Sequence, residues 1–110
     1  MAKFGGFGGN PMQMQNLMRQ AQKMQQEAME AEEEINQTEL VGSAGGDMVK
    51  VTIKGNKDVV SVSINPNVVD PDDVAMLEDL VVAAFGDAFR KADKLRNEKL
   101  GRFGNLGGLM

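Results

Sequence analysis

The spacing of apolar residues changes twice along the chain, and these changes limit the possible folds more than any other feature of the sequence. Apolar residues recur every three or four positions over residues 11–37, alternate with polar residues over residues 49–64, and return to a three-four spacing after residue 74. The outer patterns are typical of amphipathic helices, and the central pattern is typical of half-buried strands. The sequence therefore predicts an α+β fold with a helix on each side of a small sheet.

The sheet is expected to contain three strands. Valine and isoleucine alternate with lysine, threonine and serine at residues 49–53 and 60–64, which indicates two of them. The intervening KGNKD has the glycine and asparagine of a hairpin loop, and GSAGGD upstream offers a second turn. QTELVGSA, residues 37–44, is then the first strand of a three-stranded antiparallel meander. The predicted order is α-β-β-β-α, with two sheet edges open to covering or pairing.

The first helix is expected to be long and to carry a narrow apolar seam. The seam follows the heptad spacing of a coiled coil: Met14, Leu17, Ala21, Met24, Ala28, Ala31 and Ile35. A helix of about 25 residues is roughly 37 Å long, which is more than a small core can cover. We therefore expect the seam to project or to pair with a second copy in a homodimer. Methionines at this spacing are more often residues of a protein's own core, and this alternative to an exposed or paired seam stays open.

The start of the last helix is indicated by VDPDDV. Asp70 suits the N-cap, Pro71 the first helical position and Asp73 the third. An apolar stripe follows at helical spacing and is expected to pack on the sheet. Its members are Val74, Leu77, Val81, Ala84, Phe85, Ala88, Phe89, Ala92 and Leu95.

The composition argues against most enzyme and metal chemistry. The chain has no cysteine and no histidine, which excludes disulfides and thiolate zinc sites and removes the commonest general base and metal ligand. The glutamates of residues 27–39 lack the loop spacing of a calcium site. We expect no catalytic residue, no metal and no cofactor.

Both ends of the chain are rich in glycine and poor in apolar residues. Residues 1–9 and 101–110 are expected to be flexible tails around a single domain at residues 10–100. No stretch has the apolar length of a signal peptide core or a membrane span. The expected location is cytoplasmic.

A basic segment near the end of the chain contrasts with the net charge of −4. Residues 89–103 hold two acidic residues and six basic ones: Arg90, Lys91, Lys94, Arg96, Lys99 and Arg102. Three readings are open: a solvated helix end that complements the helix dipole, a partner for an acidic surface, or a nucleic-acid contact. Composition alone favours the first reading, since charge runs are usually solvated faces.

The first helix is polarised in charge. Arg19 and Lys23 lie toward its start, whereas residues 27–39 hold six glutamates and no basic residue. Because the dipole disfavours negative charge at a helix C-terminus, the basic segment of the same or a second subunit is a natural partner for these glutamates. Arg19 and Lys23 either flank a duplex or keep a coiled coil soluble, and the sequence does not decide between these roles.

Four segments, LMRQAQKMQQEA, VGSAGGDMVKVTIKGN, VSVSINPNVVDPDD and MLEDLVVAAFGDAFRKA, occur in that order. Together they resemble the YbaB/EbfC family of bacterial nucleoid-associated proteins over nearly the whole of residues 10–100. The resemblance implies a homodimer of α-β-β-β-α subunits that binds DNA with little sequence preference. It implies no catalytic chemistry and no cofactor.

The resulting hypothesis is a homodimeric nucleoid-associated protein that binds double-stranded DNA through its phosphates, with DNA and itself as partners. No membrane and no small-molecule substrate is expected, and the location is the cytoplasm and nucleoid. The expected DNA contacts are Arg90, Lys91, Lys94, Arg96, Lys99 and Arg102, with Arg19 and Lys23 as a second set. The alternative is a protein-protein interaction adaptor that uses the heptad helix and the sheet edges.

Overall fold

The computed structural model of the chain describes residues 11–108, without the side chains of residues 102 and 104–108. Its elements are α2 (Pro11–Gln37), β1 (Glu39–Ala44), β2 (Val49–Lys54), β3 (Val59–Ile64), the short 3-10 helix η1 (Pro66–Val68) and α3 (Val74–Gly108). The predicted α-β-β-β-α order is therefore confirmed. Residues 11–30 and residues 31–108 belong to two separate compact units, the first of them part of α2 alone.

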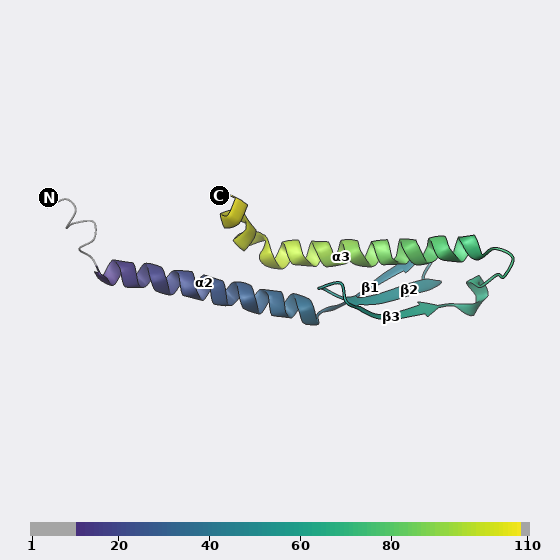
Figure 1. The fold of residues 1–110 in the computed structure, drawn as a ribbon, viewed down its shortest axis with the longest axis horizontal. Coiled ribbons are helices and arrows are strands. Elements are labelled where there is room, and N and C mark those ends of the chain that lie inside the picture. Colours follow the sequence, from purple (N-terminus) through teal and green to yellow (C-terminus); the bar gives the residue numbers. More distant parts are fainter. Residues whose placement is uncertain (1–10, 109–110) are drawn as a thin grey trace. The chain divides into compact units, whose positions relative to one another are not determined.

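The three strands form one antiparallel sheet in the order β1-β2-β3, as the alternating pattern predicts. Val49, Val51 and Ile53 of β2 are fully buried because α3 lies along the face of the sheet to which they point (Figure 1). The polar residues between them point to the opposite face. The core thus consists of one sheet face and one helix.

Small residues let α3 approach β1 closely. Gly42 of β1 and Ala84 and Ala88 of α3 are all buried. A Cβ atom added at Gly42 would lie only 2.3 Å from the carbonyl oxygen of Ala84 and 2.4 Å from the nitrogen of Ala88. The strand and the helix are therefore in backbone contact at this point, and only glycine fits.

The outer edge of β1 is occupied by two side chains of α3. The Ser43 N–H donates to the Asp87 carboxylate at 3.0 Å, and the Lys91 ammonium donates to the Val41 carbonyl at 2.7 Å. Lys91 and Asp87 also form an ion pair at 3.4 Å, one turn apart on α3. Two backbone groups that an added strand would need are thus already bonded.

The last turn of α2 is anchored to the β2–β3 hairpin. Ile35 is fully buried. A Cβ atom at Gly55 would lie 2.2 Å from the Ile35 carbonyl oxygen, and the Gly55 N–H donates to the Thr38 carbonyl at 2.9 Å. Ile35, the last residue of the predicted heptad seam, therefore packs within its own subunit.

The start of α3 differs from the expectation that Asp70 is its N-cap. The helix begins at Val74, and the Asp73 carboxylate accepts from the N–H of Met76, so Asp73 is the capping residue. Asp70 instead accepts from the N–H of Asp72 at 2.9 Å, and its carbonyl accepts from the N–H of Asp73. The same aspartates can cap a turn or a helix, and here a turn precedes the helix.

At the other end, α3 continues to Gly108, past residue 100, where the sequence predicts the folded part to end. The flexibility of residues 101–110 stays a prediction. The N-terminal tail predicted at residues 1–9 lies outside the described residues.

Candidate nucleic-acid interface

The basic segment lies on the C-terminal half of α3, and its described basic side chains are all exposed. These are Arg90, Lys91, Lys94, Arg96 and Lys99. The structure gives them three different environments. Arg102 lies in α3, but its side chain is outside those described.

Arg96 and Lys99 pair with the acidic end of α2. The Arg96 guanidinium lies 2.7 Å from the Glu32 carboxylate, and the Lys99 ammonium lies 2.9 Å from the Glu34 carboxylate. All four side chains are between 42% and 63% exposed. The negative end of the α2 dipole and its glutamates favour cations beside the C-terminus of α2, and α3 places two cations there. The pairing that the charge pattern suggests therefore forms within one subunit.

Lys91 donates to a backbone carbonyl on the outer edge of β1, as described above. The N–H of Ser43 is the main reason that the pKa of Asp87 is lowered, and the hydrogen bond and charge of Lys91 add to it. Both effects stabilise the charged carboxylate. An ionised Asp87 attracts the Lys91 ammonium, which lies one turn away on the same helix. Lys91 therefore already has two partners within the fold, the Asp87 carboxylate and the Val41 carbonyl.

Arg90 and Lys94 are the two basic residues of the segment that form no hydrogen bond and no ion pair, judged over the side chains that the structure describes. They are four positions apart on α3 and thus share one face of the helix. Arg90 adds only weakly to the field at Asp87. Lys94 lines a shallow hollow with Leu40, Lys91, Leu95 and Glu98. Among the basic side chains of the segment that the structure describes, these two are the most available.

Lys57 is a basic residue near this surface that the sequence analysis did not single out. It follows the β2–β3 turn with φ of 72°, and its ammonium lies 3.0 Å from the Asp93 carboxylate and 5.8 Å from the centre of the Phe89 ring. Nothing in the alternating strand pattern places this turn beside α3. The position of Lys57 beside α3 becomes evident only from the packing of the sheet on that helix.

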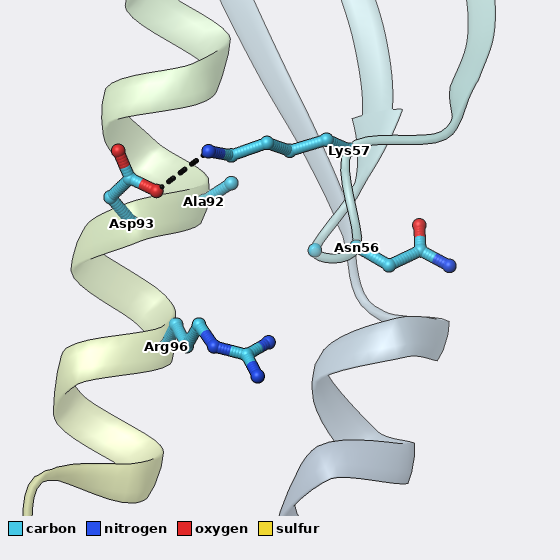
Figure 2. Close-up of a pocket in the computed structure, with 6 residues that line it drawn as sticks. Asn56, Lys57, Ala92, Asp93 and Arg96 are labelled. Carbon is cyan, nitrogen blue, oxygen red and sulfur yellow. Dashed lines mark ion pairs between the residues drawn. The ribbon is translucent and has the colours of Figure 1, made fainter. Parts of the chain in front are cut away.

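A hollow of about 250 Å³ lies between the β2–β3 turn and α3. It is lined by Gly55, Asn56, Lys57, Ala92, Asp93 and Arg96. Figure 2 shows Lys57 reaching across to Asp93, with Arg96 about a turn further along α3. Both cations at the hollow already have a carboxylate partner, so it is no strong anion site by itself.

Two further lysines lie on the face of the sheet that α3 does not cover. Lys50 and Lys54 alternate with the buried residues of β2 and therefore point away from the helix. Neither forms an ion pair with a described side chain. They carry the same charge as Arg90 and Lys94 on a different surface.

The unit of residues 11–30 exposes both the second basic set and most of the predicted seam. Arg19 and Lys23 are exposed and four positions apart, without an ion pair to any described side chain. Met14, Leu17 and Met24 are 62%, 60% and 43% exposed. Of the other seam residues, Ala21 is exposed, and Ala28 and Ala31 are half-buried.

Within the described residues, no group of three or more carboxylates could hold a metal ion. None of the helices in residues 11–108 is both apolar enough and long enough to cross a membrane.

Comparison with known proteins gives consistent matches. Residues 9–108 match the family model of the YbaB/EbfC DNA-binding family. A nucleoid-associated protein of Ruminiclostridium cellulolyticum is 45% identical over 106 residues, covering 96% of this chain and 90% of the relative. One of Rhodococcus erythropolis is 51% identical over 102 residues, covering 92% and 90%. The crystal structure of an uncharacterized Helicobacter pylori protein shares the fold, with a TM-score of 0.63 and 23% identity over 82% of this chain and 92% of that one.

Proposed function

Because the chain belongs to the YbaB/EbfC DNA-binding family, we propose that it is a nucleoid-associated protein that binds double-stranded DNA through the phosphates. The observation that carries this proposal is the pair of exposed, unpaired cations Arg90 and Lys94 on one face of α3. A cation without an internal partner can neutralise a phosphate and release its condensed counterion without first breaking a bond. Relatives named nucleoid-associated protein support a location in the cytoplasm and nucleoid.

Sequence preference should be low. Base readout needs side chains such as asparagine, glutamine or a bidentate arginine that enter a groove on a recognition helix. Apart from its cations, the exposed surface of α3 around Arg90 and Lys94 carries the carboxylates of Asp93 and Glu98 and one amide side chain, Asn97. One amide gives little discrimination between bases, whereas the cations suit contact with the phosphates of the backbone, which the carboxylates repel.

The active form is a homodimer, and β3 is the surface that supports it best. Val62 and Ile64 pair with buried residues of β2 and so lie on the same sheet face as the core, yet they are 44% and 37% exposed. The helix packs on β1 and β2 and leaves β3 largely uncovered. Within the described residues, no further strand pairs with the outer edge of β3. A second subunit would cover this apolar strip and double the number of cations facing the DNA.

A second candidate function is an adaptor that binds other proteins through the seam of α2. The exposure of Met14, Leu17 and Met24 favours it, because thioethers pack against partners of different shapes. One stoichiometric protein partner recovered after nuclease treatment, together with no binding to purified DNA, would replace the nucleoid proposal by this one.

The proposal is tested by fluorescence anisotropy of a labelled random-sequence duplex titrated with the purified protein. A dimer that offers Arg90 and Lys94 twice neutralises at least about four phosphates, so affinity should fall at least about 100-fold from about 50 to about 200 mM salt. Unlabelled duplexes of unrelated sequence should compete equally well. Absence of binding at the lower salt concentration, or affinity that does not change with salt, would overturn the phosphate mechanism.

A further inference from the structure

We propose that Glu32 and Glu34 at the end of α2 mask Arg96 and Lys99, and that DNA phosphates must displace these carboxylates to reach the two cations. This inference rests on the proposed function. It makes the acidic end of α2 an intramolecular competitor that sets how tightly the protein holds DNA.

The geometry supports competition because each carboxylate occupies its cation directly. The Arg96–Glu32 and Lys99–Glu34 pairs are 2.7 and 2.9 Å long, and each joins two residues more than 60 positions apart. Arg96 and Lys99 are three positions apart on α3, so both pairs lie on one side of that helix. A phosphate oxygen that binds either cation takes the place of a carboxylate oxygen.

The energetics allow exchange. All four side chains are about half exposed, and exposed ion pairs stabilise a protein only weakly. Such a pair cannot exclude a duplex phosphate, which lies in a dense row of like charge. The ion pair can, however, lower the net binding free energy that each phosphate contact contributes. Isolated anions should displace the carboxylates less well than a duplex does.

Arg96 and Lys99 differ from the neighbouring cations because each already has a carboxylate partner. Arg90 and Lys94 have no partner to displace, whereas Lys91 is bonded to the backbone of β1. DNA should therefore meet Arg90 and Lys94 first and recruit Arg96 and Lys99 at the cost of two weak pairs. The order of engagement follows from the partners of each residue.

The test compares Glu32→Gln/Glu34→Gln with Glu33→Gln/Glu39→Gln in the anisotropy assay. Both variants remove two negative charges, but Glu33 and Glu39 are exposed residues that form no ion pair with a described side chain. The first variant should bind the duplex about 3- to 10-fold more tightly than the control variant, as expected for release of two exposed pairs. Far-UV circular dichroism at the assay temperature checks that all the variants are folded.

A second comparison repeats both changes in an Arg96→Gln/Lys99→Gln background. If the glutamates act through these two cations, the advantage of Glu32→Gln/Glu34→Gln over its control should vanish there. An advantage that persists would mean that the glutamates repel DNA as general charges, and it would overturn the inference.

The outcomes separate this inference from the proposed function. A wild-type protein that binds the duplex, with equal affinity in the two glutamate variants, would refute the masking and leave DNA binding in place. Failure of the wild type and of every variant to bind would overturn the proposed function and the masking with it.

Discussion

Replacement of Gly42 by alanine is the most direct test of how α3 is seated on the sheet. The added Cβ atom would lie 2.3 Å from the Ala84 carbonyl oxygen and 2.6 Å from the Ala88 Cβ atom. Since ordinary contacts between non-bonded atoms are about 3.5–4.0 Å, β1 and α3 must separate by roughly 1 Å. Both partners are rigid elements of the core, so no side-chain rotation relieves the overlap.

The expected loss of stability is large for a domain of this size. Overpacking a core typically costs about 1–3 kcal/mol and occasionally more, and contact with backbone atoms places Gly42→Ala at the upper end. A loss of about 3 kcal/mol lowers the midpoint of thermal unfolding by roughly 12 °C or more. The assay is far-UV circular dichroism during heating, at one fixed subunit concentration because a dimer's midpoint depends on it.

Gly101→Ala is the matched control. Gly101 lies in α3 with nothing within 4 Å of the added atom. The same chemical change there should leave stability unchanged or raise it by up to about 1 kcal/mol, since alanine favours a helix over glycine. A Gly42→Ala variant as stable as the Gly101→Ala variant would refute the close approach of α3 and β1.

Further predictions concern Asp87 and β3. The pKa of Asp87 is lowered in the fold, so its contribution to stability is present above the ordinary pKa of an aspartate and is lost as the pH falls through the folded value. Denaturant titrations should therefore show wild type losing more stability than Asp87→Asn between about pH 5 and pH 2; parallel losses would contradict this role. Val62→Glu should raise the dimer dissociation constant at least about 100-fold in analytical ultracentrifugation, because a partner would bury the charge. Ser61→Glu on the opposite sheet face should not, and equal effects would rule out β3 as the interface.

The fold could be predicted from the sequence because each element has a clear period. Val49, Val51 and Ile53 alternate with polar residues and are the buried face of β2. The predicted start of α3 was wrong by a few residues because Asp70 and Asp73 can both cap, and only the turn at Asp72 decides between them. Local sequence therefore predicted the elements better than their ends.

The candidate site could be predicted only as a set of cations, not by the partners of each. Net charge and spacing indicate that the glutamates of α2 need a positive partner, but not whether Arg96 reaches Glu32 in its own subunit. The bond from Lys91 to the Val41 carbonyl depends on the packing of α3 against β1. Such bonds join distant parts of the chain, and no local period encodes them.

The measurement that tests the central claim most directly compares Arg90→Gln/Lys94→Gln with Lys50→Gln/Lys54→Gln in the duplex anisotropy assay over a range of salt concentrations. Both variants lack two unpaired cations, one pair from α3 and the other from the open sheet face. The α3 variant should bind at least about 10-fold more weakly than wild type, with a salt slope smaller by about 3.6, because its dimer would neutralise about four fewer phosphates. The sheet variant should retain the wild-type slope. Equal weakening in the two variants, or greater weakening in the sheet variant, would contradict the assignment of DNA binding to α3.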